Sequence, residues 1–464
     1  MNKTDNIILN TDTYKVGHYG FMEPNTTKMF SYIEARKGGE YKVAQFFGLQ
    51  YFLKEYLTTP ITQEMIDEAD KFITNNHVPF AFNKDGWQYI LDNHDGYLPI
   101  RIKAVREGSV IPEGNVLVTI ENTDPNCAWL VSYLETITLR SVWYGTTVAT
   151  RGYALRNVIK EYIDRTGTES TDMWKVWDFG QRGVSSHESG VVGGMGHIIN
   201  SMGTDSIMGI LGAQEYYNET DMLAFSIAAS EHSVTTSYGE DGEKDFIVNA
   251  IEKFGGKGKM ISLVADSYDT LRFVDYIGEL QDMIYDNGCT IVVRPDSGIP
   301  EEIDLQVIER LDQHFGHTLN SKGYKVLHPS VRIIQGDGIN IETVRRILSR
   351  LENNGWSVDN IVFGSGGFLL QNMTRDTLRF AQKTSYIEVD GVGRDVYKNP
   401  KTDPSKASKR GRMTLVRDSK GIRTIPEKEL NDSMEELLIP VFENGKILKE
   451  WSFTEVRSAS MGAS

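Results

Sequence analysis

The sequence predicts an α/β protein built on a parallel sheet, which is either closed into a barrel or open. Four short runs rich in valine and isoleucine each end abruptly in polar or glycine residues, namely MISLVADSYD (260–269), TIVVRPDSG (290–298), VRIIQGDG (331–338) and NIVFGSGG (360–367). Buried parallel strands have this pattern. Helical stretches alternate with these runs, and such an alternation implies parallel connections between strands.

The predicted helices flank these strands, so that the strand–loop–helix pattern begins at about residue 146. They cover residues 149–165, 268–286, 299–315 and 340–354. A further glycine-rich stretch, at 190–200, does not follow the G-x-G-x-x-G order of a dinucleotide site. We therefore expect those glycines to allow close packing of a helix.

The two ends of the chain have a different character. Residues 1–145 mix short β-like runs with helical stretches, and 98–120 predict a small antiparallel unit. After about residue 385 the chain becomes β-like and basic. Because 464 residues exceed one simple core, we predict two domains. One is a mixed, β-rich domain from residues 1–145 plus 385–464, and the other is an α/β domain from residues 146–384.

Composition excludes several classes of protein. An apolar fraction of 40% and a charged fraction of 24% are those of a folded soluble protein. The formal net charge of −15 argues against broad binding of nucleic acid or of an anionic membrane. Cys127 and Cys289 match no metal spacing; one disulfide is formally allowed, but we expect two buried thiols. With no apolar run long enough to span a bilayer and no signal-peptide pattern, we expect a cytoplasmic protein.

Polar residues at the ends of the four strands form the strongest candidate site. Active sites of parallel α/β proteins gather where strands give way to loops at their carboxyl ends. The residues at these ends are Asp266, Arg294, Asp296, Asp337, Gly366 and Gly367. Any one of these loops has common turn chemistry, but their recurrence at successive strand ends favours a function. Arginine and backbone N–H groups suit a phosphate, and carboxylates suit ribose hydroxyls or a metal, so a phosphorylated sugar fits.

Three further segments have both a functional and a structural interpretation. WDFGQRGVSS (177–186) joins Phe179 to Arg182 across a glycine-bounded turn. This pair suits stacking on a planar ring, and the structural alternative is a core phenylalanine beside a surface arginine. Asp205 precedes an apolar helix, and its structural interpretation is an N-cap or an acidic residue of the first turn, stabilised by the helix dipole. His232 lies among small and hydroxyl-bearing residues. In such a loop a histidine acts as a base, a phosphate contact or a phospho-acceptor, and the alternative is a structural histidine.

A basic stretch follows the last strand. In MTRDTLRFAQK (373–383), Arg375, Arg379 and Lys383 fall on roughly one side of a predicted helix, which is either an anion site or a solvated face. Composition assigns no role to Asp12, Tyr14 and Arg36 near the N-terminus.

Taken together, these segments resemble the nicotinamide phosphoribosyltransferase family of type II phosphoribosyltransferases in NAD salvage. The matching motifs, in chain order, are TDTYKVGHY, DFGQRGVSS, GTDSIMG, AASEHS, VADSYD, RPDSG, SKGYK, QGDG, FGSGG, MTRD and DPSKASKRGRM. The resemblance implies a type II phosphoribosyltransferase barrel and a homodimer with shared active sites. It also implies transfer of phosphoribose from phosphoribosyl pyrophosphate to nicotinamide, with Mg²⁺ as cofactor and ATP as activator.

The resemblance also implies a role for each matched residue. Phe179 and Tyr14 of the partner subunit would enclose the nicotinamide ring, and Asp205 would accept from its carboxamide. Arg182, His232 and Arg294 would contact pyrophosphate or the ring surroundings, and ATP would phosphorylate His232. The ribosyl phosphate would contact Asp296, Gly336, Asp337, Gly366, Gly367 and Arg375, with Asp12 and Asp266 also near substrate. Arg36, Lys383, Lys398 and Lys406 would line a basic anion channel.

The chemistry of the reaction agrees with these residues. The pyridine nitrogen is already a nucleophile and carries no proton, so positioning and stabilisation of the leaving pyrophosphate should dominate. Asp205 suits an amide NH₂ and would repel nicotinate, which favours nicotinamide as substrate. The alternatives are a nicotinate phosphoribosyltransferase and a non-catalytic protein that binds a phosphoribosyl ligand.

Overall fold

The computed structural model describes residues 5–78, 81–168, 170–402 and 407–461. The chain divides into two compact units. The first unit comprises Met1–Thr150, Gly212–Thr220 and Met373–Ser464, and the second comprises Arg151–Leu211 and Asp221–Asn372. Among the described residues, no helix is both long and apolar enough to cross a membrane. Cys127 and Cys289 are free, buried thiols, as predicted.

The second unit contains a parallel sheet whose two edges come together. Its strand order is β7-β6-β14-β13-β10-β9-β8. The strands are β6 (Val176–Asp178), β7 (Gly203–Thr204), β8 (Ala228–Ala229), β9 (Met260–Val264), β10 (Thr290–Arg294), β13 (Val331–Gln335) and β14 (Ile361–Ser365). A parallel bridge joins Gly203 on β7 to Phe225, which precedes β8, so the sheet curls into a barrel. The strands predicted within 260–269, 290–298, 331–338 and 360–367 are therefore confirmed.

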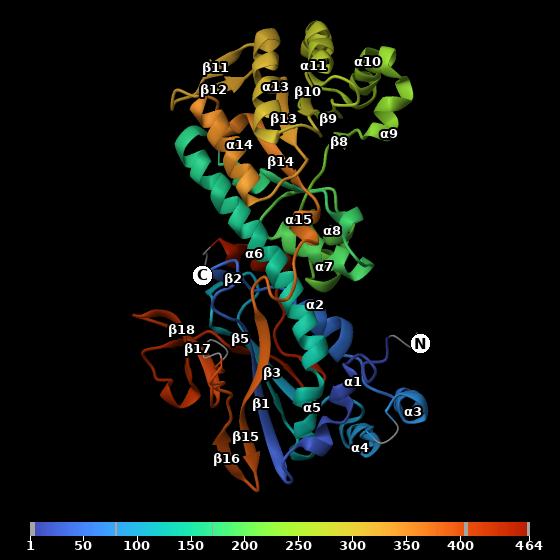
Figure 1. Ribbon diagram of the computed structural model, residues 1–464, viewed down its shortest axis with the longest axis vertical. Coiled ribbons are helices and arrows are strands. Elements are labelled where there is room, and N and C mark those ends of the chain that lie inside the picture. Colours follow the sequence, from blue (N-terminus) through green and yellow to red (C-terminus); the bar gives the residue numbers. More distant parts are fainter. Residues whose placement is uncertain (1–4, 79–80, 169, 403–406, 462–464) are drawn as a thin grey trace. The chain divides into compact units, whose positions relative to one another are not determined.

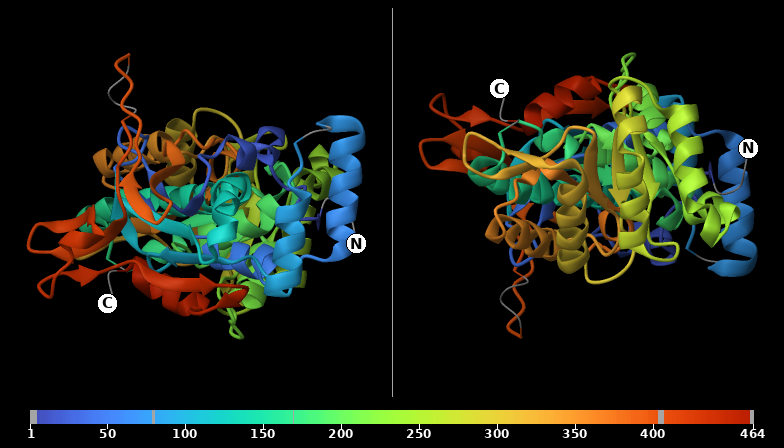
Figure 2. Two further views of the ribbon diagram at one scale, coloured as in Figure 1. Left: turned by 90° about the horizontal axis from the view of Figure 1, so that it is seen from below. Right: turned by 90° about the horizontal axis from the view of Figure 1, so that it is seen from above.

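Helices lie outside these strands in the second unit (Figure 1; Figure 2, right). They are α7 (His187–Ile198), α9 (His232–Thr235), α10 (Glu243–Phe254), α11 (Thr270–Glu279), α12 (Gln281–Asn287), α13 (Pro300–Phe315), α14 (Ile341–Asn353) and α15 (Gly367–Leu370). Local sequence explains where several begin: Asp269 and Asn340 accept backbone N–H groups at the starts of α11 and α14, and Pro300 opens α13. A short hairpin, β11 (His317–Leu319) and β12 (Lys325–Leu327), completes this unit.

Two helices have residues in both units, α6 (Glu135–Thr166) and α8 (Ile207–Tyr216). One glycine of the stretch 190–200, Gly194, allows the close packing of helices that the sequence predicts. A Cβ built on Gly194 of α7 would lie 2.7 Å from the Cα of Gly209 on α8, so only glycine permits this approach.

The first unit is built on an antiparallel sheet with strands from both chain ends. The order is β16-β15-β1-β5-β3-β20-β21. These strands are β1 (Thr26–Ala35), β3 (Ile100–Ala104), β5 (Val116–Asn122), β15 (Phe380–Val389), β16 (Val392–Asp395), β20 (Ile439–Glu443) and β21 (Lys446–Ile447). The antiparallel pairing of β3 with β5 is the one predicted within 98–120.

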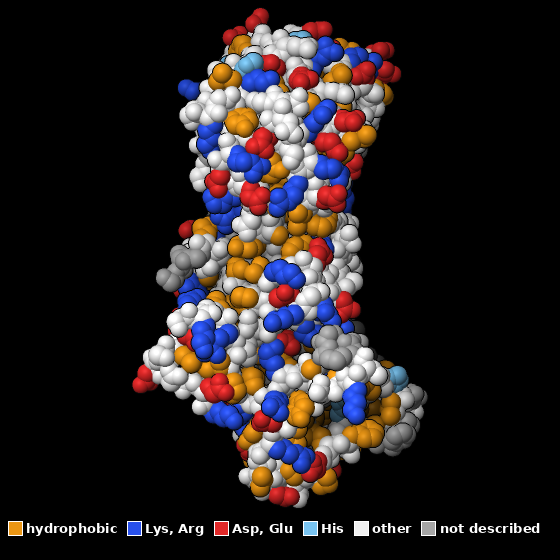
Figure 3. Space-filling view, turned by 60° about the vertical axis from the view of Figure 1, so that its left-hand side comes forward, with side chains coloured by type: hydrophobic (Ala, Val, Ile, Leu, Met, Phe, Trp, Pro, Cys, Tyr) orange, Lys and Arg blue, Asp and Glu red, His pale blue; other side chains and the backbone are white. Residues whose placement is uncertain are grey.

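Smaller elements complete the first unit. Its other strands are β2 (Val43–Gln45), β4 (Val110–Pro112), β17 (Met413–Asp418), β18 (Gly421–Pro426) and β19 (Glu435–Glu436). Its helices are α1 (Thr13–Val16), α2 (Leu49–Phe52), α3 (Gln63–Phe72), α4 (Lys84–His94), α5 (Ala128–Tyr133) and α16 (Phe453–Ser460). On the face drawn in Figure 3, basic and acidic side chains are interspersed.

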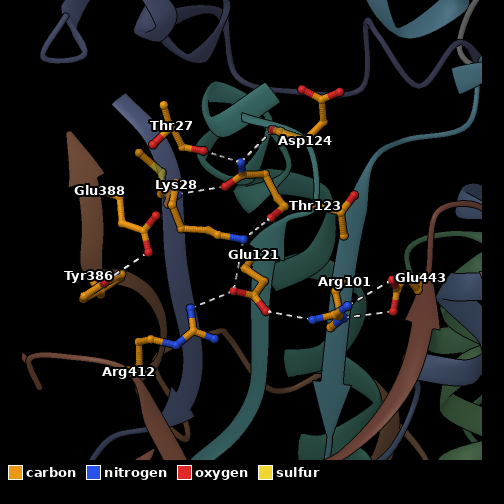
Figure 4. A network of polar contacts seen from close by, with 12 residues as sticks. Thr27, Lys28, Arg101, Glu121, Thr123, Asp124, Tyr386, Glu388, Arg412 and Glu443 are labelled. Carbon is orange, nitrogen blue, oxygen red and sulfur yellow. Dashed lines mark hydrogen bonds and ion pairs between the residues drawn. The ribbon is translucent and has the colours of Figure 1, made fainter. Parts of the chain in front are cut away.

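An ion-pair network crosses the sheet of the first unit around Glu121 on β5 (Figure 4). Glu121 accepts a hydrogen bond from Arg412 at 2.7 Å and lies 3.7 Å from Lys28 and 3.6 Å from Arg101. Arg101 also makes a two-pronged pair with Glu443, at 2.9 and 3.0 Å. Burial alone would raise the pKa of Glu121, but the Arg412 hydrogen bond and these cations hold it below the ordinary value.

The division into units differs from the predicted domains at three segments, the shortest of which is residues 146–150, in the first unit. Strand β15 begins at Phe380 and pairs with β1, so residues 373–384 belong to the first unit rather than the second. Residues 212–220 also belong to the first unit, where the Tyr217 hydroxyl donates to buried Glu107 at 2.6 Å. The predicted helix over 373–383 is wrong, because β15 begins at Phe380 and Arg379 before it has a φ of 54°.

Candidate active site

The carboxyl ends of the parallel strands gather the predicted residues at one rim of the second unit. Neighbouring strands are in parallel register, with Asp178 opposite both Ser365 and Thr204, so their ends lie at the same edge. The predicted residues that follow these strand ends are Phe179, Arg182, Asp205, His232, Asp266, Arg294, Asp296, Gly336, Asp337, Gly366 and Gly367.

Phe179 forms an aromatic wall at this rim. The ring is partly buried and packs on the apolar cluster of Trp177, Val292 and Ile334. Two glycines leave space for it: a Cβ on Gly364 would lie 2.0 Å from the ring, and a Cβ on Gly336 would lie 3.4 Å from it. The structure therefore holds the ring by packing on neighbouring strands.

Gly336 also lies beside the charged end of β10. A Cβ on Gly336 would be 3.5 Å from Asp296 Oδ1 and 3.6 Å from Arg294 Cδ. The aromatic wall, an arginine and a carboxylate thus surround one glycine. Arg294 itself donates to the backbone carbonyl of Ser230 at 2.8 Å, which ties its guanidinium to the end of β8.

Asp205 presents an exposed carboxylate after β7. Its Oδ1 accepts a hydrogen bond from Ser226 at 2.5 Å. Ser206, not Asp205, caps helix α8, because the Ser206 hydroxyl accepts the Gly209 N–H at 3.2 Å. The capping interpretation of Asp205 is therefore wrong, and its carboxylate remains available to a ligand.

A second carboxyl group, Asp178, is buried at the end of β6, directly before Phe179 in the chain. Its Oδ1 accepts the Gly180 N–H at 2.7 Å, and its backbone carbonyl accepts the Asp205 N–H at 3.1 Å. Burial raises the pKa of Asp178 to about 7, and the negative charge of Asp205 adds to this effect. The sequence did not single out Asp178, although it directly precedes Phe179 in the chain.

His232 meets two carboxylates at the rim. Its Nε2 is 2.9 Å from Asp266 Oδ1, and its Nδ1 is 3.9 Å from Asp296 Oδ2. A carboxylate only accepts hydrogen bonds, so Nε2 carries the proton that it donates to Asp266. In the neutral ring, Nδ1 then has an unprotonated lone pair. Candidate metal-ligand atoms of these three residues lie within 4.8 Å of one another. Two carboxylates suit Mg²⁺, which binds few protein groups and completes its shell with water and phosphate.

The remaining rim residues are less enclosed. Arg182 is 86% exposed and lies 3.7 Å from Glu231, which fits a group that meets a ligand from solvent. The Asp337 N–H is held by Gln335 Oε1 at 2.9 Å, an interaction the sequence did not indicate. A Cβ on Gly367 would meet nothing within 4 Å, so its backbone has open space beside it.

The other predicted residues lie in the first unit. Asp12 accepts a hydrogen bond from Thr136 at 2.6 Å, while the Tyr14 side chain is 63% exposed. Arg375 contacts Asp376 at 3.2 Å. Their roles toward substrate stay predictions.

Three of the four predicted channel residues come together in the first unit. Burial lowers the pKa of Lys383, and the charges of Lys398 and Arg36 lower it further, against the opposing charge of Glu135. Arg36 is held by the backbone carbonyl of Arg379 at 3.0 Å. Lys406 lies outside the described residues.

Comparison with protein families gives two matches. Residues 174–446 match the Nicotinate phosphoribosyltransferase (NAPRTase) family. Residues 6–102 match the Nicotinamide phosphoribosyltransferase, N-terminal domain.

Similar proteins and structures agree with these matches. The chain is 44% identical to a nicotinamide phosphoribosyltransferase of Xanthomonas campestris, over 99% of this chain and 98% of that protein. It is 32% identical to the Mycoplasma pneumoniae nicotinamide phosphoribosyltransferase, over 88% and 95%. Among solved structures, Pyrococcus furiosus nicotinate-nucleotide pyrophosphorylase has a TM-score of 0.66 at 16% identity, covering 100% of this chain and 96% of that one. Human nicotinic acid phosphoribosyltransferase has a TM-score of 0.60 at 16% identity, covering 98% and 93%.

At this identity, the solved structures show the fold alone, and it is the predicted α/β barrel with a second, β-rich domain. The sequence matches extend along almost the whole chain. The chain therefore belongs to the nicotinate phosphoribosyltransferase family and, within it, resembles the nicotinamide phosphoribosyltransferases, whose N-terminal domain it shares.

Proposed function

We propose that this protein transfers phosphoribose from phosphoribosyl pyrophosphate to nicotinamide, giving nicotinamide mononucleotide and pyrophosphate. The observation that carries the proposal is the grouping of Phe179, Arg294 and Asp296 around Gly336. Phe179 offers an aromatic face to a planar acceptor, and Arg294 and Asp296 offer charged groups to a phosphorylated sugar. All three side chains lie within contact distance of the Cβ position of Gly336. The names of the similar proteins support the same reaction.

Each side of the rim has a separate task in this proposal. Phe179 stacks on the nicotinamide ring, and Asp205 accepts a hydrogen bond from the carboxamide NH₂. Gly336 and Asp337 hold the ribose. The Gly366–Gly367 backbone takes the 5′-phosphate, since the space beside Gly367 lets the phosphate approach.

The chemical step is a substitution at C1 of the ribose. The C1–O bond breaks with its electron pair leaving on pyrophosphate, and the ring nitrogen lone pair forms the new C1–N bond. No proton moves, so the residues act by position and charge. Arg294 and Arg182 stabilise the negative charge that grows on pyrophosphate. Asp296 and Asp266 would hold Mg²⁺, which would supply further neutralisation of the charge on the leaving pyrophosphate.

His232 gives the site a place for activation by ATP. Asp266 holds Nε2–H, which directs the Nδ1 lone pair toward Asp296. We propose that Nδ1 attacks the γ-phosphorus of ATP, so that a P–N bond forms, a P–O bond breaks and ADP leaves. A phosphorylated His232 would stand beside the pyrophosphate position and bias the reaction toward product.

A homodimer is part of the proposal. Tyr14 is an aromatic residue whose side chain is 63% exposed, as expected of a group that another subunit covers. Tyr14 of the partner subunit would close the second face of the nicotinamide ring. The molecular mass in solution tests this directly: a monomer at micromolar concentration would exclude it.

Transfer to nicotinic acid is the second candidate, because the matching family model carries that name. The test is pyrophosphate release with nicotinamide or nicotinic acid as acceptor, with Mg²⁺, and with or without ATP. We expect release with nicotinamide, stimulation by ATP, and loss of that stimulation in His232→Ala. Asp205→Asn should shift selectivity toward nicotinic acid by roughly tenfold or more, since it removes a like charge.

Asp282→Asn is the matched control for this shift, because Asp282 is an exposed carboxylate on α12, away from the strand ends. Release with nicotinic acid alone would replace the first candidate with the second. Binding of phosphoribosyl pyrophosphate without release under any condition would leave only a binding protein.

A further inference from the structure

Helix α13 places a carboxyl group inside the second unit. Asp304 is 0% exposed and lies on the helix face that also buries Val307, Ile308 and Leu311. Burial raises the pKa of Asp304 well above its ordinary value. A carboxyl group in an apolar layer costs free energy that an aliphatic side chain of similar size would not. We therefore look for the role of this carboxyl group in the hydrogen bond that it accepts.

The contact is with Gln335, the last residue of β13 and only 1% exposed. Gln335 Nε2 donates to Asp304 Oδ1 at 2.9 Å. The other end of the same amide, Oε1, accepts the Asp337 N–H at 2.9 Å. Because Asp304 accepts at one end and a backbone N–H donates at the other, the amide has one orientation.

These hydrogen bonds join the bases of two loops at the rim. Helix α13 begins at Pro300, shortly after the loop that follows Arg294 and carries Asp296. Gln335 leads directly into Gly336 and Asp337. A Cβ on Gly336 would lie 3.5 Å from Asp296 Oδ1, so the two loops meet at the site. A shift of the Gln335 side chain would move one loop against the other.

We propose that Asp304 is a positioning residue that acts through Gln335 to set Asp337 and Gly336 against Asp296, and so shapes the site for the ribosyl pyrophosphate. The inference rests on the proposed function for its ligand. Asp304 touches no substrate. Its contribution is the placement of backbone and carboxylate groups that do, and errors of about 1 Å in such placement are costly to catalysis.

Variants of the full chain separate positioning from a merely structural role. Asp304→Val removes the hydrogen bond between Asp304 and Gln335, whereas Gln335→Met removes that bond and the acceptor of the Asp337 N–H. The double variant replaces both buried side chains with apolar groups, which restores part of the stability. Asp304→Asn keeps an acceptor for Gln335. The control is Asp359→Val. Asp359 accepts the N–H and hydroxyl of Thr168, at 3.0 and 2.9 Å, at the opposite, amino ends of the strands.

Steady-state kinetics give the first readout. We expect Asp304→Val and Gln335→Met to raise KM for phosphoribosyl pyrophosphate roughly tenfold, more than they raise KM for nicotinamide. The KM of the double variant should be no higher than that of Gln335→Met, because Gln335→Met alone already breaks the whole linkage from Asp304 to Asp337. Asp304→Asn should stay within about twofold of the wild type, and so should Asp359→Val.

Hydrogen–deuterium exchange gives a second readout, independent of turnover. In peptides covering residues 333–340, amide exchange should be faster than in the wild type for Asp304→Val and Gln335→Met. It should equal the wild-type rate for Asp304→Asn and Asp359→Val. Equal KM values for phosphoribosyl pyrophosphate in the wild type and in folded Asp304→Val would overturn the inference. So would equal losses in Asp304→Asn and Asp304→Val. If the wild type releases no pyrophosphate, the proposed function fails instead, and the exchange pattern alone decides whether Asp304 positions this loop.

Discussion

Substitution of Gly364 by alanine should damage the site through Phe179. Gly364 lies within β14, opposite Trp177 on β6. An added Cβ would stand 2.0 Å from Phe179 Cε2 and 2.2 Å from Cδ2. Carbon atoms ordinarily approach to about 3.5 Å, so the ring must move by about 1.5 Å. Overpacking of this kind costs about 1–3 kcal/mol of unfolding free energy.

The same movement should weaken nicotinamide binding. A ring displaced by more than 1 Å no longer presents its face in register with Asp205 and Gly336, so we expect KM for nicotinamide to rise at least roughly tenfold. Urea unfolding measures the first effect, and pyrophosphate release at varied nicotinamide measures the second. Gly183→Ala is the control, because a Cβ on Gly183 meets nothing within 4 Å.

A second substitution identifies the cause. In Gly364→Ala with Phe179→Leu, the smaller side chain removes the clash, so stability should recover while nicotinamide affinity stays low. Wild-type stability and wild-type KM in Gly364→Ala would refute the reasoning. A double variant no more stable than Gly364→Ala would show that the ring is not what the Cβ displaces.

Two predictions concern protonation. The pKa of Asp178 is raised to about 7, so the folded protein favours the protonated carboxyl group. The free energy of unfolding is therefore highest below about pH 4, and it falls as the pH rises toward 7. Asp178→Asn should therefore gain stability relative to the wild type over that range, and a pH-independent difference in urea midpoint would contradict this. Glu121 has a lowered pKa, so its contribution is lost as pH falls. Glu121→Gln should cost about 2–4 kcal/mol at pH 7 and less at pH 4, whereas Glu435→Gln, at an exposed pair, should cost under about 1 kcal/mol.

Strand length decided how much of the barrel the sequence could predict. Strands β9, β10, β13 and β14 each have five residues, enough for a valine- and isoleucine-rich run to stand out from its loops. Strands β7 and β8 have two residues each, too few to show any period. The rim was nevertheless predicted, because its polar residues follow directly on the longer strands.

Pairing between distant segments accounts for what the sequence did not predict. Residues 373–383 carry helix-forming spacing, but β15 forms there because β1 is available to pair with it. Asp304 offered a signal, since it shares the apolar side of its helix with Ile308 and Leu311. A single sequence could not show that its donor is Gln335, on another element.

The pairing of β1 with β15 also has a consequence for synthesis of the chain. Ala35 pairs with Phe380, and the residues between them include the whole second unit. At ribosomal rates of roughly 5–20 residues per second, the edge of β1 that pairs with β15 stays unpaired for about 20–70 s during synthesis. The second unit can complete its barrel during that interval, whereas the first unit carries an open strand edge that invites wrong pairing. Translation speed and chaperone supply should therefore limit the yield of this protein through its first unit.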